Sequence, residues 1–449
     1  MRHLPGFRLV LCAALLATVA ACGPENSQSN GSTAPVRLYG SDGNMLNGVG
    51  ALVKNQPRLL NGMKGTAPLI RLTEDFKRRL RNIDPNLKDL AYAGESYDAI
   101  VIVALATQLA RTTNPEVVKD YIIGVTNFGQ QCTAVADCLR LARMGKDLQY
   151  VGVTVKTGLS EIGEPSTTTY GTMHFDENNK INDVLTEYVG AGAPGTASAE
   201  PGPEPAKPSS KATGAPLIIG DLTSHSGGNS ESNPPIIAGA KLALKEINDA
   251  EGVLEKPVEW LTGDDGTDIE KAKAQLKAHL SAGAQVVLGP TTSRVTAGIM
   301  EEITSGKVIA ISPSATSAQL STVADEGRFF RTAPSDVLQG KALADVILRD
   351  GTKKISIIAM KGPYGEGLQI NVRDELIKAG VPSTQIQTVN YEAPSDDTVP
   401  LSLSEQVKAI KAFAPDGVLI IGLDESAQVV TQLATAGVDP RKTAAPKAG

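Results

Sequence analysis

The chain has 449 residues, of which 41% are hydrophobic and only 4% aromatic, with 44 glycines. This composition is typical of α/β proteins with packed cores and excludes a disordered or fibrous chain. Forty-three basic and 49 acidic residues give a formal charge of −6, so we expect no nucleic-acid partner. The four histidines and four cysteines show no metal-ligand spacing, and we expect neither a metal site nor a cofactor.

The N-terminus has the pattern of a bacterial export signal. Two arginines, Arg2 and Arg8, precede an apolar run at 9–21, which is too short to span a bilayer but fits a secretory signal. The run ends in Val-Ala-Ala followed by Cys22, which resembles the bacterial lipobox. We therefore predict a signal peptide over 1–21, lipidation of Cys22 and a polar tether over 22–35. An ordinary signal peptide cut before Cys22 is the alternative.

The next segment, 36–190, mixes strand and helix patterns but does not read as a complete domain. The residue pattern predicts a strand at 36–39, helices near 74–81, 97–111 and 134–144, and a β-pair over 169–181.

Two cysteines in this segment, Cys132 and Cys138, are close in the sequence. Export makes a disulfide permissible, and the pair would close a small loop. We predict a disulfide, with two free thiols as the alternative. The spacing is not Cys-x-x-Cys, which disfavours a redox catalyst.

Residues 191–215 form a predicted linker. They contain five prolines and four glycines, and no aliphatic residue larger than alanine. Such a segment cannot bury enough apolar surface to fold by itself.

Strands and helices alternate from 216 to 443, before a short tail at 444–449. Apolar β-branched strands between amphipathic helices indicate parallel sheets with both faces covered, in a doubly wound α/β architecture. The number of units exceeds one sheet, so we expect two lobes, at 216–335 and 336–443. The strands are predicted at 217–219, 258–261, 284–288, 308–311, 355–359, 386–391 and 417–421, and the helices at 236–249, 269–281, 295–304, 337–349, 366–379, 403–413 and 427–436.

Two hydroxyl-rich turns follow successive predicted strands, Gly-Pro-Thr-Thr-Ser at 289–293 and Ser-Pro-Ser-Ala-Thr at 312–316. Both lie at the carboxyl ends of parallel strands, where open α/β sheets bind ligands. Backbone N–H groups and hydroxyls there suit a carboxylate; plain N-capping is the alternative. No phosphate loop, nucleophile elbow or zinc-protease motif is present, and we do not expect an enzyme.

Several stretches resemble the bacterial branched-chain amino-acid-binding proteins, type I periplasmic solute-binding proteins of ABC importers. Residues 217–442 resemble the N-terminal two-thirds of that family, and 37–181 its C-terminal third. The matching stretches are GAKLALKEIND, VVLGPTTS, ISPSATSAQLS, PYGEGL and AGVDPRK after the linker, and LYGSDGN, LNGMKGTAP, YAGESYDAI and CTAVADC before it.

The order of the two parts is inverted relative to the family, which implies a circular permutation with the linker joining the family's usual termini. The resemblance then implies two doubly wound lobes with a hinge. Lobe one would combine about 66–160 with 216–335, and lobe two 36–65, 161–190 and 336–443. We expect a monomer; a swapped dimer of complementary fragments is the alternative.

The resemblance also implies a ligand site on lobe one. Ser293 matches a serine whose hydroxyl and N–H hold the ligand carboxylate. Ser314 matches a position whose backbone carbonyl accepts from the ligand ammonium. Thr316 matches a threonine that contacts both groups, and Ala315 lies between them in the same turn.

On lobe two, Tyr364 matches a tyrosine that lies over the ligand, and Asp42 occupies the place of an acidic residue that pairs with the ammonium. A second family tyrosine is absent near 422–424, and no aromatic lies between 224 and 235. The resemblance thus implies an extracytoplasmic, membrane-tethered protein that binds a small amino acid, branched-chain or similar, or an amide. It would deliver this ligand to ABC permease subunits; a sensing module without transport is the alternative.

Overall fold

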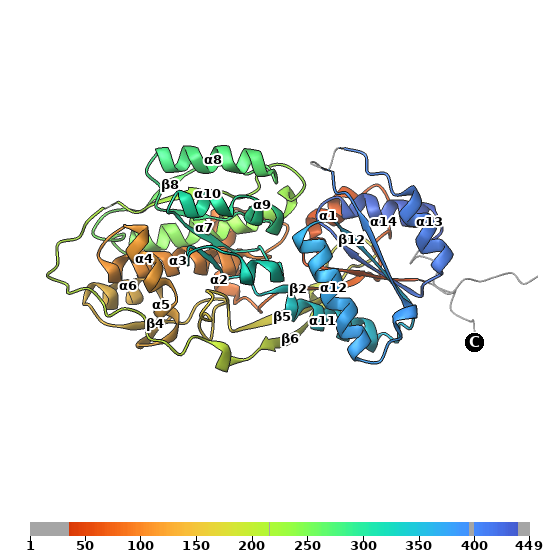
Figure 1. Ribbon diagram of the computed structural model, residues 1–449, viewed down its shortest axis with the longest axis horizontal. Helices are drawn as coiled ribbons and strands as arrows, with labels where there is room; N and C mark the ends of the chain where they lie inside the picture. Colours follow the sequence, from red (N-terminus) through yellow and green to blue (C-terminus); the bar gives the residue numbers. More distant parts are fainter. Residues whose placement is uncertain (1–35, 215, 395–398, 439–449) are drawn as a thin grey trace, which may run out of the picture. The chain divides into compact units, whose positions relative to one another are not determined.

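The computed structural model describes residues 36–214, 216–394 and 399–438 (Figure 1). Two larger sheets with mostly parallel strands dominate these residues, which confirms the predicted α/β class. The predicted signal peptide, Cys22 and the tail at 444–449 lie outside the described residues. Within the described part, no helix combines the length and apolarity that crossing a bilayer requires.

One sheet has five strands in the order β11-β10-β9-β7-β8, and all its pairs are parallel. The central strand β9 and its neighbour β10 are buried along their whole length, as expected when helices cover both faces. The strands and helices of this region are β7 (Ile218–Asp221), α7 (Asn233–Asp249), β8 (Glu259–Leu261), α8 (Ile269–Ser281), β9 (Val286–Leu288), α9 (Ser293–Gly298), α10 (Met300–Ser305), β10 (Ile309–Ser312) and β11 (Phe329–Arg331).

The other sheet has seven strands in the order β13-β12-β14-β1-β2-β5-β6. Its first five strands are parallel, whereas β5 and β6 extend one edge in antiparallel fashion. The elements are β1 (Arg37–Gly40), α1 (Asn47–Leu52), β2 (Lys64–Pro68), β5 (Thr167–His174), β6 (Glu187–Gly192), α11 (Asp336–Arg349), β12 (Ile355–Met360), α12 (Pro363–Lys378), β13 (Ile386–Tyr391), α13 (Ser404–Phe413), β14 (Gly417–Ile421) and α14 (Ser426–Thr435).

The first described strand lies inside the seven-stranded sheet. β1 pairs in parallel with β14, with Arg37 opposite Gly417, and with β2 on its other side. Helix α1 likewise contacts α14, the red-orange and dark blue helices that lie together in Figure 1. Segments from both ends of the described chain therefore build one sheet.

The helices between β2 and β5 belong instead with the five-stranded sheet. Helix α3 (Ala93–Ala110) is buried along all of its 18 residues, although it contains Glu95 and Asp98. It packs along α7 and contacts β9 and β10. Because 36–190 is divided between the two sheets, it has no core of its own. The remaining elements here are α2 (Glu74–Ile83), α4 (Pro115–Ile122), α5 (Gly124–Asn127), β3 (Gln130–Cys132), α6 (Val135–Arg143) and β4 (Leu148–Tyr150).

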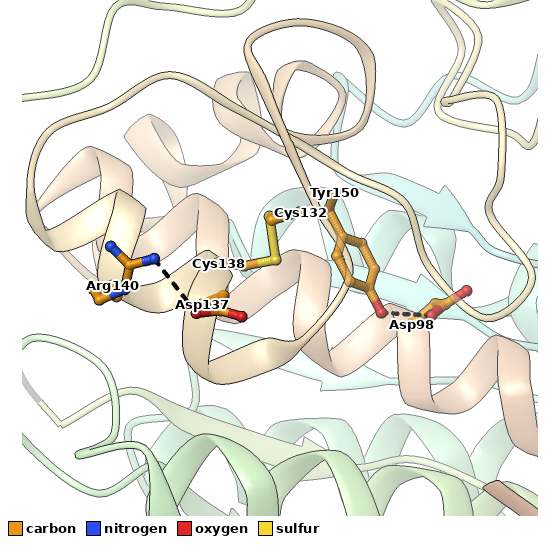
Figure 2. Close-up of a disulfide and its surroundings, with 6 residues drawn as sticks. All are labelled: Asp98, Cys132, Asp137, Cys138, Arg140 and Tyr150. Atoms are coloured by element: carbon orange, nitrogen blue, oxygen red, sulfur yellow. Dashed lines mark hydrogen bonds and ion pairs between the residues drawn. A yellow bond between two sulfur atoms is a disulfide. The ribbon is translucent and has the colours of Figure 1, made fainter. Parts of the chain in front are cut away.

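A disulfide joins Cys132 and Cys138, as predicted (Figure 2). It connects the end of β3 to α6. Beside it, the Tyr150 hydroxyl donates to Asp98 of α3 at 2.8 Å (Figure 2). The same carboxylate accepts from the backbone N–H groups of residues 153–155, and so holds the chain after β4 against α3.

The proline-rich segment has little regular structure after β6, which already includes residues 191 and 192 of the predicted linker. The segment is nevertheless held by backbone hydrogen bonds. The Ala206 N–H donates to the Leu109 carbonyl at 2.9 Å, and the Thr113 N–H donates to the Thr213 carbonyl at 3.1 Å. These contacts hold the segment against the end of α3.

The single helix predicted over 295–304 is wrong, because the structure has two helices, α9 and α10. The break falls at Ile299, whose φ of −118° and ψ of 12° are not helical. Just before it, a Cβ added to Gly298 would lie 2.6 Å from the Ile269 side chain of α8. The close approach of α8 thus requires glycine, which is a poor helix former.

The predicted β-pair over 169–181 is also largely wrong. Strand β5 pairs with β2 and β6, and only Phe175 and Ile181 bridge across the expected turn. The neighbouring strands of the sheet supply a longer ladder for β5 than the local hairpin offered.

Candidate functional site

A cavity of about 240 Å³ lies at the carboxyl ends of strands from both sheets. Its lining comes from the segments after β7, β8, β9 and β10 of the five-stranded sheet, and after β1, β12, β13 and β14 of the seven-stranded sheet. This is the edge at which open α/β sheets bind ligands. The volume suits a small molecule rather than a polymer.

Asp42 lies in this cavity wall, directly after β1, and its side chain is 4% exposed. The Tyr92 hydroxyl donates to its Oδ2 atom at 2.6 Å, and the Tyr364 hydroxyl donates to its Oδ1 atom at 2.7 Å. Both tyrosines also line the cavity. The carboxyl group is therefore held in one orientation by two partners from different parts of the chain.

Tyr364 is fixed in turn by its place in the first turn of α12. Gly362 precedes that helix with a φ of 108°, a conformation that favours glycine, and Pro363 occupies a first-turn position where proline is tolerated. The Tyr364 hydroxyl lies 2.8 Å from the Ser41 hydroxyl and accepts from the Gly43 N–H at 3.3 Å. These contacts join α12 to the turn that carries Asp42.

The opposite wall carries hydroxyl groups, as the two predicted turns suggested. Ser293 is 3% exposed and Ser314 is half-buried, and both line the cavity. The Ser314 hydroxyl donates to the Thr291 carbonyl at 3.0 Å, which ties the two turns together. The Ser293 hydroxyl accepts from the Ser317 N–H at 3.1 Å.

Ala315 and Thr316 are both buried, and among the described residues that line the cavity neither is present. The Ala315 carbonyl accepts from Arg331, and the Thr316 carbonyl accepts from the Asp336 N–H at 2.8 Å. The structure thus buries these two predicted ligand contacts next to Ser314 in the sequence but outside the cavity lining.

Burial raises the pKa of Asp42 above its ordinary value, and the hydrogen bonds from Tyr92 and Tyr364 partly offset this effect. Burial, with the neighbouring Asp42 carboxylate, also raises the pKa of Asp336 at the start of α11. A cation placed against Asp42 would favour its ionised form. The arrangement can therefore bind a positive group at Asp42 and accommodate a negative group at the hydroxyl-rich turns.

Several lining residues were not predicted from the sequence. Tyr92 stands in the YAGESYDAI stretch, which resembles the family, but the resemblance implies no role for this tyrosine. Three other lining residues follow strands of the five-stranded sheet: Asn229, Thr292 and Arg294. Their position after a predicted strand was the sequence signal that could have identified them as site residues. In the part of the chain that the structure describes, no group of three or more His, Cys, Asp or Glu side chains could hold a metal ion.

Sequence comparison finds relatives among amino acid binding proteins. A Leu/Ile/Val-binding protein homologue of Brucella abortus is 30% identical over 180 residues, covering 39% of this chain and 47% of that protein. An amino acid binding protein of Pseudomonas aeruginosa is 29% identical over 169 residues, covering 37% of this chain and 45% of its own. The chain thus spans about half the length of the curated relatives it matches.

Two solved structures have partial similarity. A leucine binding protein, LivK, of Thermotoga maritima has a TM-score of 0.41 and 20% identity, covering 49% of this chain and 61% of that one. The branched-chain amino acid transporter substrate binding protein LivJ of Streptococcus pneumoniae, solved with isoleucine, has a TM-score of 0.42 and 23% identity, covering 50% of this chain and 62% of its own.

The periplasmic binding protein family matches residues 216–448, which is more than half of the sequence. That match contains the hydroxyl-rich turns and Tyr364. The chain therefore belongs to the periplasmic binding protein family, whose members are extracytoplasmic solute-binding proteins.

Proposed function

We propose that this protein binds a small amino acid or amide in the cavity between its two sheets and delivers it to an ABC permease. The observation that carries the proposal is the pairing of opposite chemistries across one cavity. A buried carboxyl group stands at Asp42, and hydroxyl groups stand at Ser293 and Ser314. A zwitterion carries a positive and a negative group, and the cavity has a partner for each. Charge-assisted hydrogen bonds in a desolvated cleft are stronger than those between neutral groups.

In the proposed complex the ligand ammonium contacts Asp42, and the ligand carboxylate contacts the turn that contains Ser293. Ala315 and Thr316 do not line the cavity and so do not touch the ligand in this complex. Tyr364 covers the ligand from the other lobe. Because the lining residues come from both sheets, closing one lobe on the other completes the site, as in hinge-closing binding proteins.

The test is a thermal-shift screen of amino acids and short amides, followed by calorimetry on each compound that raises the melting temperature. A ligand of the folded state increases apparent stability in proportion to its concentration relative to Kd. We expect at least one amino acid to bind with a stoichiometry of one. Failure of every amino acid and amide in both assays would refute the proposal.

We also propose that the chain is a circular permutant, with residues 191–215 joining the family's usual termini. The pairing of β1 with β14 and β2 supports this, because it places the first described strand beside the last one in a single sheet. Chain termini commonly lie at the surface, where permutation is tolerated. Size-exclusion chromatography with light scattering tests the proposal: a monomer that binds one ligand is expected, and an obligate dimer would favour a swapped assembly.

We infer that the mature protein is tethered to the membrane through a lipid on Cys22. The lipobox-like sequence and the polar residues at 23–35 support this. We expect the wild-type protein to fractionate with membranes and Cys22→Ala to be released or retained as an unprocessed precursor. Equal fractionation of the two processed proteins would argue against the lipid.

A further inference from the structure

The cavity has one wall without aliphatic side chains. Among the described residues, those from the five-stranded sheet that line it are all polar or glycine. Aliphatic lining comes only from the seven-stranded sheet, chiefly Met360 and Leu423. A branched aliphatic ligand side chain would cover the polar wall without forming hydrogen bonds to it, which is costly.

Two buried residues of this polar wall have unused hydrogen-bonding capacity. Asn229 is 5% exposed, and its Nδ2 group makes only a long contact of 3.4 Å to the Thr291 hydroxyl. Within the described residues its side-chain oxygen has no partner. The Thr292 hydroxyl is also buried without a partner in the described chain, and it does not cap α9. Buried polar groups without partners are uncommon and call for an explanation.

The charges at this side of the cavity balance. Arg294 is half-buried and donates to the Thr267 carbonyl at 2.6 Å, while the exposed Asp268 lines the same wall. Across the cavity, Lys361 and Glu392 form an exposed ion pair at 2.6 Å. The lining also contains Glu425, a buried carboxyl group that accepts from the Tyr391 hydroxyl at 2.6 Å and whose pKa is raised by burial. A fully charged ligand side chain would therefore meet a like charge beside Arg294 and beside Lys361. An uncharged group that both donates and accepts is better matched.

We propose that the ligand is an amino acid whose side chain ends in a carboxamide, of the glutamine or asparagine type. A carboxamide carries two donors and an acceptor oxygen in one plane. It can therefore supply partners to Asn229 and Thr292 at the polar wall while its α-ammonium contacts Asp42. This inference rests on the proposed function of the same cavity.

The first test is calorimetry of the full mature chain with glutamine, asparagine, glutamate, leucine, isoleucine and valine. We expect a carboxamide amino acid to bind at least tenfold more tightly than any of the other four. Tighter binding of leucine, isoleucine or valine would overturn the inference and leave the proposed function intact. If none of the six compounds binds, and no other amino acid or amide binds either, both the inference and the proposed function are overturned.

The second test removes the hydroxyl of Thr292. Because this hydroxyl has no partner and caps no helix, Thr292→Val should not lower the melting temperature of the free protein. It should weaken binding of the carboxamide ligand about fivefold and change leucine binding less than twofold. Thr186→Val is the matched control, because that hydroxyl is also buried and unpartnered in the described chain but Thr186 does not line the cavity.

A second variant, Asn229→Leu, keeps the approximate side-chain size and removes the amide. We expect the ratio of leucine affinity to glutamine affinity to rise at least tenfold, with the exposed Asn86→Leu as control. If both Thr292→Val and Asn229→Leu leave the ratio of leucine affinity to glutamine affinity unchanged, the polar wall does not discriminate between ligand side chains and the inference is wrong.

Discussion

The replacement Asp42→Asn tests the proposed ammonium contact most directly. The substitution retains the size and planarity of the side chain and removes its charge. An amide oxygen accepts from one of the two tyrosine hydroxyls that contact Asp42 at 2.6 and 2.7 Å, and the other hydroxyl can turn to accept from the amide nitrogen, so the cavity wall should keep its shape. A hydrogen bond to a charged group contributes about 1.5–3 kcal/mol, so the affinity for the amino acid should fall roughly 10- to 150-fold.

The same substitution should not destabilise the free protein. Burial raises the pKa of Asp42, so folding is opposed by ionisation of this group, and its contribution to stability is lost as the pH rises through the raised pKa. At pH 7.5, Asp42→Asn removes that opposition, and the melting temperature should be equal to or higher than that of the wild type. The expected pattern is weaker binding without loss of stability, which a merely unfolded variant cannot produce.

Calorimetry at pH 7.5 measures the affinity, and a thermal melt of the same sample measures stability. Asp89→Asn is the matched control, because burial also raises the pKa of Asp89 and its carboxylate accepts from the Asn47 and Gly48 N–H groups, but it does not line the cavity. We expect this control to change affinity less than twofold. A Kd for Asp42→Asn within threefold of the wild type, in a folded protein, would remove Asp42 from the ligand site.

Three further predictions concern the pH dependence, the disulfide and the tyrosine that covers the ligand. Burial raises the pKa of Asp265 from 3.8 to about 6, so its contribution to stability is present below pH 4 and is lost as the pH rises through 6. Asp265→Asn should therefore stabilise the protein by up to about 3 kcal/mol at pH 8 and by little at pH 4 in urea unfolding; equal effects at both pH values would contradict this. Replacing Cys132 and Cys138 together by alanine should lower the free energy of unfolding by about 2 kcal/mol, since the bridge closes a short loop, with no change in ligand affinity. An unaltered melting curve would show that the bridge adds nothing to stability. Tyr364→Phe removes a 2.7 Å hydrogen bond to Asp42 and should weaken ligand binding three- to tenfold by calorimetry, whereas an unchanged Kd would argue against a role for this hydroxyl.

The strands and helices after residue 216 could be predicted because their signals are local. β9 and β10 are short apolar runs, and each is followed by a turn rich in hydroxyls that faces the cavity. The same local reasoning failed at β5, where pairing with β2 and β6 replaced the expected hairpin, and at Gly298, where the close approach of α8 requires a glycine and the helix breaks at the next residue. In both cases a contact distant in sequence decided the local structure.

The candidate site, like the fold, could be predicted only in part from local sequence. Residue types and their resemblance to a family were enough to select Ser293, Ser314, Tyr364 and Asp42, which line the cavity, but they also selected Ala315 and Thr316, which do not. They did not reveal Tyr92, whose only signal is one tyrosine shortly before a predicted helix. Its contact with the Asp42 carboxylate exists because the chain between β1 and α3 passes from one sheet to the other.

From the amino-acid order one could derive the α/β class, the disulfide and the two hydroxyl-rich turns, because each depends on neighbouring residues. Only the folded chain brings Asp42 within 2.7 Å of Tyr364, a residue 322 positions away, and sets both against a wall of polar side chains. Which groups share a cavity depends on strand order in the sheets, and strand order is decided by packing between distant segments.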